Sequence, residues 1–249
     1  MRADRPQYEN ILKIFDAFSS SHHLWEIWQD CITAIACAIS NAFDKRFFDD
    51  REKLYKDTVS KYNEADRLRF SEIFAEIVNQ IDANPEQDFL GDLYMQLDLG
   101  SHWHGQFFTP YDICRLMADV TVTEEFNVEH MRVIPINDCA CGGGATIIAG
   151  AHEIRRRLEK IGLNYQDYVV CYAQDLSFVA GMMCYIQLSL QGLAGVIKIA
   201  DTLSDPLVDT DNGPDIWYTP MWFSPVWEMR RRARTIVKFM KNCEEVKQS

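Results

Sequence analysis

The chain has 249 residues, of which 47% are hydrophobic, and a formal net charge of −12 at pH 7. This length and composition suffice for one sizeable core with a helical appendage. The acidic balance argues against a protein that binds nucleic acid unaided, because phosphate contacts need Lys and Arg. The N-terminus carries no secretory signal, and the longest apolar run, Cys31–Ile39, is shorter than the roughly 20 residues that span a bilayer. We therefore expect a cytoplasmic protein without membrane contact.

Residues 1–100 are predicted to form a helical region. Apolar residues recur there at helical spacing in three stretches, and charged residues fill the other faces. The stretches are Tyr8–Phe18, His23–Phe43 and Glu64–Ile81. The sequence Asp82-Ala83-Asn84-Pro85 predicts a break after the third stretch.

Residues 101–249 are predicted to form an α/β domain. Short runs rich in β-branched residues alternate there with longer runs of helical periodicity. The expected strands are Arg132–Asn137, Tyr168–Ala173, Val196–Ala200 and Asp215–Thr219, and the expected helices are Ala145–Lys160, Ser177–Gln191 and Pro225–Asn242. This alternation is typical of a parallel, doubly wound, Rossmann-like sheet. Pro135 is awkward in the first strand, since proline removes one donor from the hydrogen-bond ladder.

A glycine turn, Gly142-Gly143-Gly144, stands where the first expected strand gives way to a helix. Glycine tolerates positive φ and lets a ligand approach the backbone closely. The turn lacks the Gly-Lys-Ser/Thr of a phosphate loop and the Gly-x-Gly-x-x-Gly spacing of a dinucleotide site. A carboxylate beside it, Asp138, would repel a pyrophosphate but suits a ligand with an ammonium and a sulfonium. S-adenosyl-L-methionine carries both charges.

Two further acids follow the next expected strands. Asp175 can accept hydrogen bonds from both hydroxyls of a ribose, and Asp201 can accept from an adenine amino group. The carboxyl ends of parallel strands share one edge of a sheet, so all three acids are expected to converge on one crevice. Each feature alone is equally consistent with an ordinary turn or an unrelated surface acid, and their combination favours an S-adenosyl-L-methionine pocket.

Two segments of the chain resemble one known family. The run Asp138-x-Ala140-Cys141-Gly142-Gly143-Gly144 is similar to the Asp-Pro-Ala-Cys-Gly-Ser-Gly loop of adenine-N6 DNA methyltransferases, above all the modification subunits of type I restriction systems. Upstream, the run 105–110 (Gly-Gln-Phe-Phe-Thr-Pro) resembles their Gly-x-Phe-Tyr-Thr-Pro segment. The resemblance covers residues 101–223 and implies these cofactor-binding residues: Phe107, Thr109, Pro110, Asp138, Ala140, Gly142, Gly144, Asp175, Asp201 and Leu203.

The catalytic motif departs from the family. The family carries Asp or Asn, then Pro-Pro and an aromatic residue, whereas this chain has Thr219-Pro220-Met221-Trp222. The resemblance implies that Thr219 accepts from the adenine amino group, that Pro220 shapes the turn and that Trp222 stacks on a flipped base. A threonine hydroxyl is shorter and less polar than an amide or carboxylate oxygen. Losing one such directed contact typically costs about 10²–10³ in rate.

Three functions remain open at this stage. The chain is a methyltransferase acting on adenine-N6 in DNA, a cofactor-binding regulatory subunit with little or no turnover, or an enzyme that methylates another acceptor such as a protein amide or RNA. About 27 residues follow Trp222, so we expect either a truncated sheet or one completed by a partner subunit or a second copy.

Other charged and metal-binding residue types carry weaker signals. His102 and His104 lack a third ligand, so no metal site is predicted. The arginine runs at residues 155–157 and 230–234 are typical of solvated helix faces, with contacts to DNA phosphate as the alternative.

Overall fold

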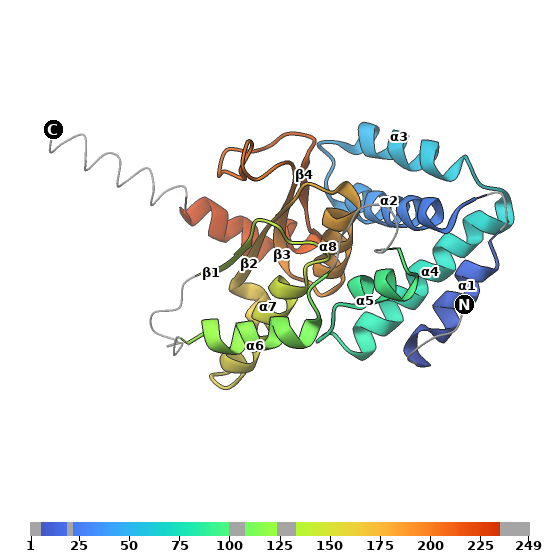
Figure 1. The fold of residues 1–249 in the computed structure, drawn as a ribbon. Helices are drawn as coiled ribbons and strands as arrows, with labels where there is room; N and C mark the ends of the chain where they lie inside the picture. Colours follow the sequence, from blue (N-terminus) through green and yellow to red (C-terminus); the bar gives the residue numbers. More distant parts are fainter. Residues whose placement is uncertain (1–5, 19–21, 100–107, 124–132, 235–249) are drawn as a thin grey trace, which may run out of the picture.

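The computed structural model describes residues 6–18, 22–99, 108–123 and 133–234, and it places a helical region beside a four-stranded sheet (Figure 1). A short 3-10 turn, η1 (Pro6–Tyr8), precedes the helices of the first half. These are α1 (Glu9–Asp16), α2 (Leu24–Phe43), α3 (Phe48–Val59), α4 (Glu64–Ala83), α5 (Phe89–Gln96) and α6 (Tyr111–Thr121). The predicted helical character is confirmed, as is the break after Ala83. Within the described ranges, no helix has the length and apolar character needed to cross a membrane.

Polar residues fix where several of these helices begin. Asn63 accepts a hydrogen bond from the backbone N–H of Asp66 (2.9 Å) at the start of α4. Asp88 accepts from the N–H of Gly91 (3.0 Å) at the start of α5. Such caps satisfy backbone donors that have no partner inside the helix, and each contributes about 1 kcal/mol.

The strands form one sheet in the order β1-β2-β3-β4. Their bounds are β1 (Ile134–Asp138), β2 (Val169–Asp175), β3 (Ala194–Ile199) and β4 (Ile216–Tyr218). The first three run parallel and are joined by the crossover helices α7 (Ala145–Glu159) and α8 (Phe178–Leu190), with a 3-10 turn, η3 (Tyr165–Asp167), before β2.

The fourth strand runs antiparallel to β3, so the prediction of an entirely parallel sheet is wrong there. The register pairs Val196 with Tyr218 and Lys198 with Ile216. A parallel return needs a crossover that carries the chain back along the sheet, usually a helix. Residues 200–215 form only turns and irregular segments, so the chain re-enters the sheet at the edge where β3 ended.

The two faces of the sheet are covered differently. Successive residues of a strand point to opposite faces. Cys171 and Ala173 of β2 join the core that α7 and α8 form, whereas Val170 packs with Trp227 on the other face. That second face carries the helix over residues 225–234 (Figure 1, red). The remainder of the expected last helix lies outside the described residues.

Pro135 sits where its missing donor costs nothing. The N–H of Ile134 donates to the carbonyl of Tyr168 (2.8 Å), next to β2. Backbone groups alternate in direction along a parallel strand, so those of Pro135 point away from β2. No described strand pairs with that side of β1. Edge strands are the place where proline is tolerated in sheets.

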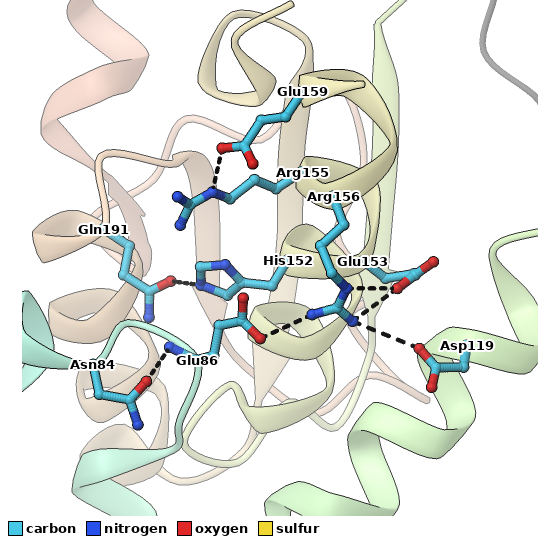
Figure 2. Close-up of polar contacts among 9 residues, drawn as sticks. All are labelled: Asn84, Glu86, Asp119, His152, Glu153, Arg155, Arg156, Glu159 and Gln191. Carbon is cyan, nitrogen blue, oxygen red and sulfur yellow. Dashed lines mark hydrogen bonds and ion pairs between the residues drawn. The ribbon is translucent and has the colours of Figure 1, made fainter. Parts of the chain in front are cut away.

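Arg156 of α7 links the helical region and α6 to the α/β part of the chain (Figure 2). Its guanidinium donates to Glu86 (2.8 Å) and to Glu153 (2.7 Å), and it lies 3.6 Å from Asp119 of α6. Partly exposed ion pairs of this kind contribute only about 0–1 kcal/mol each. These ion pairs matter because they hold α6 and α7 next to one another. Each of these helices directly follows one of the two sequence segments that resemble the family, residues 105–110 and 138–144.

Arg51 of α3 holds β4. Its side chain is 3% exposed, and its guanidinium pairs with Asp44 (3.0 Å), donates to the carbonyl of Ile216 (2.7 Å) and lies 4.1 Å from the ring centroid of Trp217. Burial pushes the pKa of Asp44 upward, but hydrogen bonds from Arg46 and Arg51 outweigh it and hold that pKa below its usual range. The carboxylate is therefore ionised near neutral pH.

Candidate functional site

The glycine turn joins β1 to α7 in a conformation that requires glycine twice. The φ angle is +52° at Gly142 and +95° at Gly144, the left-handed region that glycine occupies without steric cost. A Cβ on Gly142 would stand 2.9 Å from the ring of Phe108, and one on Gly144 would stand 2.9 Å from Sγ of Cys184. At both positions a larger residue would therefore be strained and would collide with a side chain of the same protein.

A cavity of about 180 Å³ lies between this turn, the carboxyl ends of β1 and β2, and the segment before α6. Five predicted cofactor-binding residues line it: Thr109, Asp138, Ala140, Gly142 and Asp175. Pockets for small molecules usually measure roughly 300–1,000 Å³. The described residues thus enclose room for part of a nucleoside-sized ligand.

Two carboxylates meet at this cavity because β1 and β2 are parallel and end at the same edge. Asp138 accepts from the N–H of Ala140 (3.0 Å) and from the hydroxyl of Thr146. Asp175 accepts from the N–H of Gly142 and from that of Ser177, both at 2.8 Å. A carboxylate offers about four lone-pair sites, so each acid can still accept from a ligand.

The thiol in the turn does not suit nucleophilic chemistry. A hydrogen bond with Cys184 and burial together raise the pKa of Cys141 well above the usual value for a thiol. The thiolate is the reactive form of cysteine, so Cys141 stays protonated and inert. The cavity therefore offers two fixed carboxylates and an unreactive thiol.

A family model described as N-6 DNA methylase matches residues 86–248 of the chain. That range contains the whole sheet, the glycine turn and the cavity. The chain belongs to the N-6 DNA methylase family. The relation predicted from the two sequence segments is thereby confirmed, together with the α/β fold of a methyltransferase preceded by helices.

A comparison with curated protein sequences finds no match. Among solved structures, the chain is similar to the type I restriction-modification system methyltransferase subunit from Streptococcus thermophilus, with 17% identity and a TM-score of 0.44. The similarity covers 84% of this chain and 47% of the other, so the chain spans about half the length of that subunit.

Some predicted cofactor-binding residues are not among those that line the cavity. Pro110 is the residue before α6, and Gly144 is turned into the packing against α8. Asp201 is exposed and accepts from the N–H of Leu203 (2.9 Å), and Leu203 is 95% exposed. Phe107 lies outside the described residues, as do His102 and His104. The loop after β3 nevertheless touches the turn, since Thr202 donates to the carbonyl of Cys139 (2.6 Å).

The direction of β4 places the residues predicted to be catalytic at the edge of the sheet opposite to the cavity. Thr219 is fully buried, and its hydroxyl donates to the carbonyl of Leu193 (2.7 Å) and accepts from the N–H of Gly195 (2.8 Å). Both partners stand at the amino end of β3. The strand from Gly195 to Ile199 has four residue steps, or about 13 Å, and separates Thr219 from the edge of the sheet that carries the cavity.

The rest of the tetrapeptide also lies outside the cavity beside the glycine turn. Pro220 opens a 3-10 turn, η4 (Pro220–Phe223), and Trp222 packs with Val170 and Trp227 on the face opposite α7 and α8. An antiparallel strand delivers its carboxyl end to the wrong edge of the sheet for the cavity. Thr219, Pro220 and Trp222 therefore do not line the cavity beside the glycine turn, and their catalytic roles stay a prediction.

Sequence reasoning missed the support behind the turn. The amide of Gln187 on α8 donates to the carbonyl of Gly143 (2.8 Å) and to the carboxylate of Asp88 (2.7 Å). The carbonyl end of the same side chain accepts from the N–H of Leu90 (3.1 Å). Burial raises the pKa of Asp88 to about 6, although the bonds from Gln187 and Gly91 lower it. Only the position of Asp88 three residues before Gly91, typical of a helix cap, could have identified it.

Proposed function

We propose that this chain binds S-adenosyl-L-methionine at the cavity beside the glycine turn and serves as the cofactor-binding part of an adenine-N6 DNA methyltransferase. One observation carries the proposal. Parallel strands β1 and β2 bring Asp138, Asp175 and the turn around a single cavity, in a chain of the N-6 DNA methylase family.

The residues present fit that cofactor in charge and hydrogen bonding. Asp138 would attract its ammonium and sulfonium charges, and Asp175 would accept from its ribose hydroxyls. The cofactor supplies an electrophilic methyl group. Thr109 lines the same cavity and adds a hydroxyl. The enclosed volume of about 180 Å³ leaves the rest of the ligand to contacts beyond the described lining.

The position of Thr219 favours a subunit that needs a partner over an enzyme that works alone. Methyl transfer to an adenine amino group requires acceptors aimed at that nitrogen beside the methyl donor. In this chain the hydroxyl of Thr219 forms hydrogen bonds with the backbone of Leu193 and Gly195, at the edge of the sheet opposite to the cavity. We infer that a partner subunit or a second copy supplies the acceptor groups, and that DNA reaches the site within such an assembly.

A transfer assay with radiolabelled methyl groups tests this proposal. The purified chain is incubated with S-adenosyl-L-methionine and adenine-containing DNA, and bound cofactor is measured in parallel by calorimetry. We expect micromolar cofactor binding and no label in DNA. Robust formation of N6-methyladenine by the chain alone would instead establish an active enzyme and refute the dependence on a partner.

A further inference from the structure

A second cavity, of about 220 Å³, lies where the helical region meets the α/β part of the chain. Its walls come from the last two turns of α4, from α7, from η3 and from the end of α8. None of its lining residues also lines the cavity beside the glycine turn. Sites for small molecules usually measure roughly 300–1,000 Å³, so an occupant of this cavity has fewer atoms than most cofactors.

Much of the lining of this cavity is apolar. Ile81 of α4 is 3% exposed, and Tyr165 of η3 is buried beside it. Val78, Pro85 and Leu190 complete the apolar wall. Removal of aliphatic groups from water is favourable, so this wall favours a ligand that carries an aliphatic side chain.

One buried amide lines the cavity with its hydrogen bonding incomplete. Gln191 is 6% exposed, and its Oε1 lies 2.9 Å from Nε2 of His152. Burial lowers the pKa of His152, so the imidazole is neutral near pH 7 and donates its one N–H to that oxygen. Nε2 of Gln191 has no hydrogen-bond partner among the described residues. A buried donor without a partner costs free energy, so this amide suits an acceptor atom of a ligand.

Arg155 adds a cation to the same cavity. Arg155 and His152 stand three residues apart on α7, and both extend from the helix toward Gln191 (Figure 2). Nε of Arg155 donates to Glu159 (2.7 Å), and the guanidinium lies 5.7 Å from the ring centroid of Tyr165. The bond to Glu159 uses Nε, so the two terminal nitrogens can serve a ligand. A guanidinium beside an amide donor suits a carboxylate.

An acid shares the lining with these donors. Asp82 of α4 is exposed to solvent and lines the cavity. It would repel a ligand that carried only a carboxylate, but it would attract one that also carried an ammonium group. A cation, an acid, a buried amide donor and an aliphatic wall together match the groups of one small zwitterion.

We propose that this cavity binds a free α-amino acid with an aliphatic side chain. The carboxylate lies on Arg155 and Gln191, the ammonium on Asp82, and the side chain against Ile81 and Leu190. Such a ligand joins α4 to α7 and α8, and it therefore stabilises the junction between the helical region and the α/β part. The site does not depend on binding of S-adenosyl-L-methionine at the glycine turn.

Calorimetric titration of L-leucine into the whole chain tests the proposal. We expect a dissociation constant on the order of 1 mM or below, and a rise of the thermal midpoint with leucine concentration. Isocaproate has the same side chain and carboxylate without the ammonium, and isoamylamine lacks the carboxylate. Each should bind at least about tenfold more weakly than L-leucine, because one charged contact is lost.

Two variants locate the site. Arg155→Met should weaken binding of L-leucine at least about tenfold. Arg157→Met is the matched control, because Arg157 lies on the same helix, pairs with Glu153 and does not line the cavity. It changes the net charge equally, and its effect should stay below about twofold. Val78→Trp fills the cavity from a partly exposed position of α4 and should abolish binding without removing a polar group.

Three results would overturn the assignment. The first is the absence of both heat and thermal stabilisation when folded wild-type chain meets L-leucine at about 10 mM. The second is an equal loss of binding in the two arginine variants, which would show attraction by net charge alone. The third is binding of isocaproate as tight as that of L-leucine, which would exclude the role of Asp82. Binding of L-leucine that persists in Asp175→Ala would support a site separate from the glycine turn.

Discussion

The sheet has two edges, one at the carboxyl ends and one at the amino ends of its parallel strands, and the family-like motifs have different surroundings at each. At the carboxyl edge, β1 and β2 run parallel and gather Asp138 and Asp175 at one cavity. At the amino edge, the antiparallel β4 places Thr219 against the backbone of β3, where its hydroxyl donates one hydrogen bond and accepts another. The residues that follow a strand can reach a site only at the edge of the sheet where that strand ends. Strand direction therefore separates the candidate binding site at one edge from a buried structural threonine at the other.

The largest expected effect comes from releasing β4. Arg51→Ala should lower the free energy of unfolding by about 3–5 kcal/mol, because it leaves Asp44 buried without one partner and frees the carbonyl of Ile216. Urea denaturation measures this loss. Arg46→Ala is the control, since Arg46 pairs with the same acid but its side chain is 43% exposed. A loss no greater than that of the control would mean that α3 does not hold the strand.

The next effect concerns the tetrapeptide itself. Thr219→Val removes both hydrogen bonds of a buried hydroxyl and should cost about 1–3 kcal/mol. Thr219→Asn restores the family residue but puts a larger amide at a fully buried position whose hydroxyl now bonds to the backbone of Leu193 and Gly195. We expect it to destabilise the fold without creating methyl transfer. Appearance of transfer in that variant would reinstate Thr219 as a catalytic position.

The smallest effect is a change of slope with pH. The pKa of Asp88 is raised to about 6 by burial, so the folded state binds more protons than the unfolded state between about pH 4 and pH 6. This carboxyl therefore favours the fold at low pH, and its contribution falls as pH rises through that window. Asp88→Asn should reduce the fall of the thermal midpoint with rising pH. Asp82→Asn, which removes an exposed acid, should leave that fall unchanged. An unchanged slope in Asp88→Asn would contradict burial of a titrating acid behind the turn.

The placement of Asp138, Asp175 and the glycine turn at one edge could be predicted because the signals are local, whereas Asp201 does not line the cavity. The glycine turn, Asp138 and Asp175 each follow directly from a strand end, and parallel pairing brings them together. The direction of β4 is not local. It depends on the absence of a crossover helix in residues 200–215 and on Arg51, far away in the chain. The Gln187 link to Asp88 escaped prediction for the same reason, since its partners are distant in sequence.

One measurement tests the separation of the two edges most directly. S-adenosyl-L-methionine is titrated calorimetrically into the wild-type chain, Asp175→Ala and Thr219→Val. The account predicts equal binding by the wild type and by folded Thr219→Val, and loss of binding in Asp175→Ala. Loss of binding in Thr219→Val, with Asp175→Ala unaffected, would contradict it and would place the cofactor at the amino edge of the sheet.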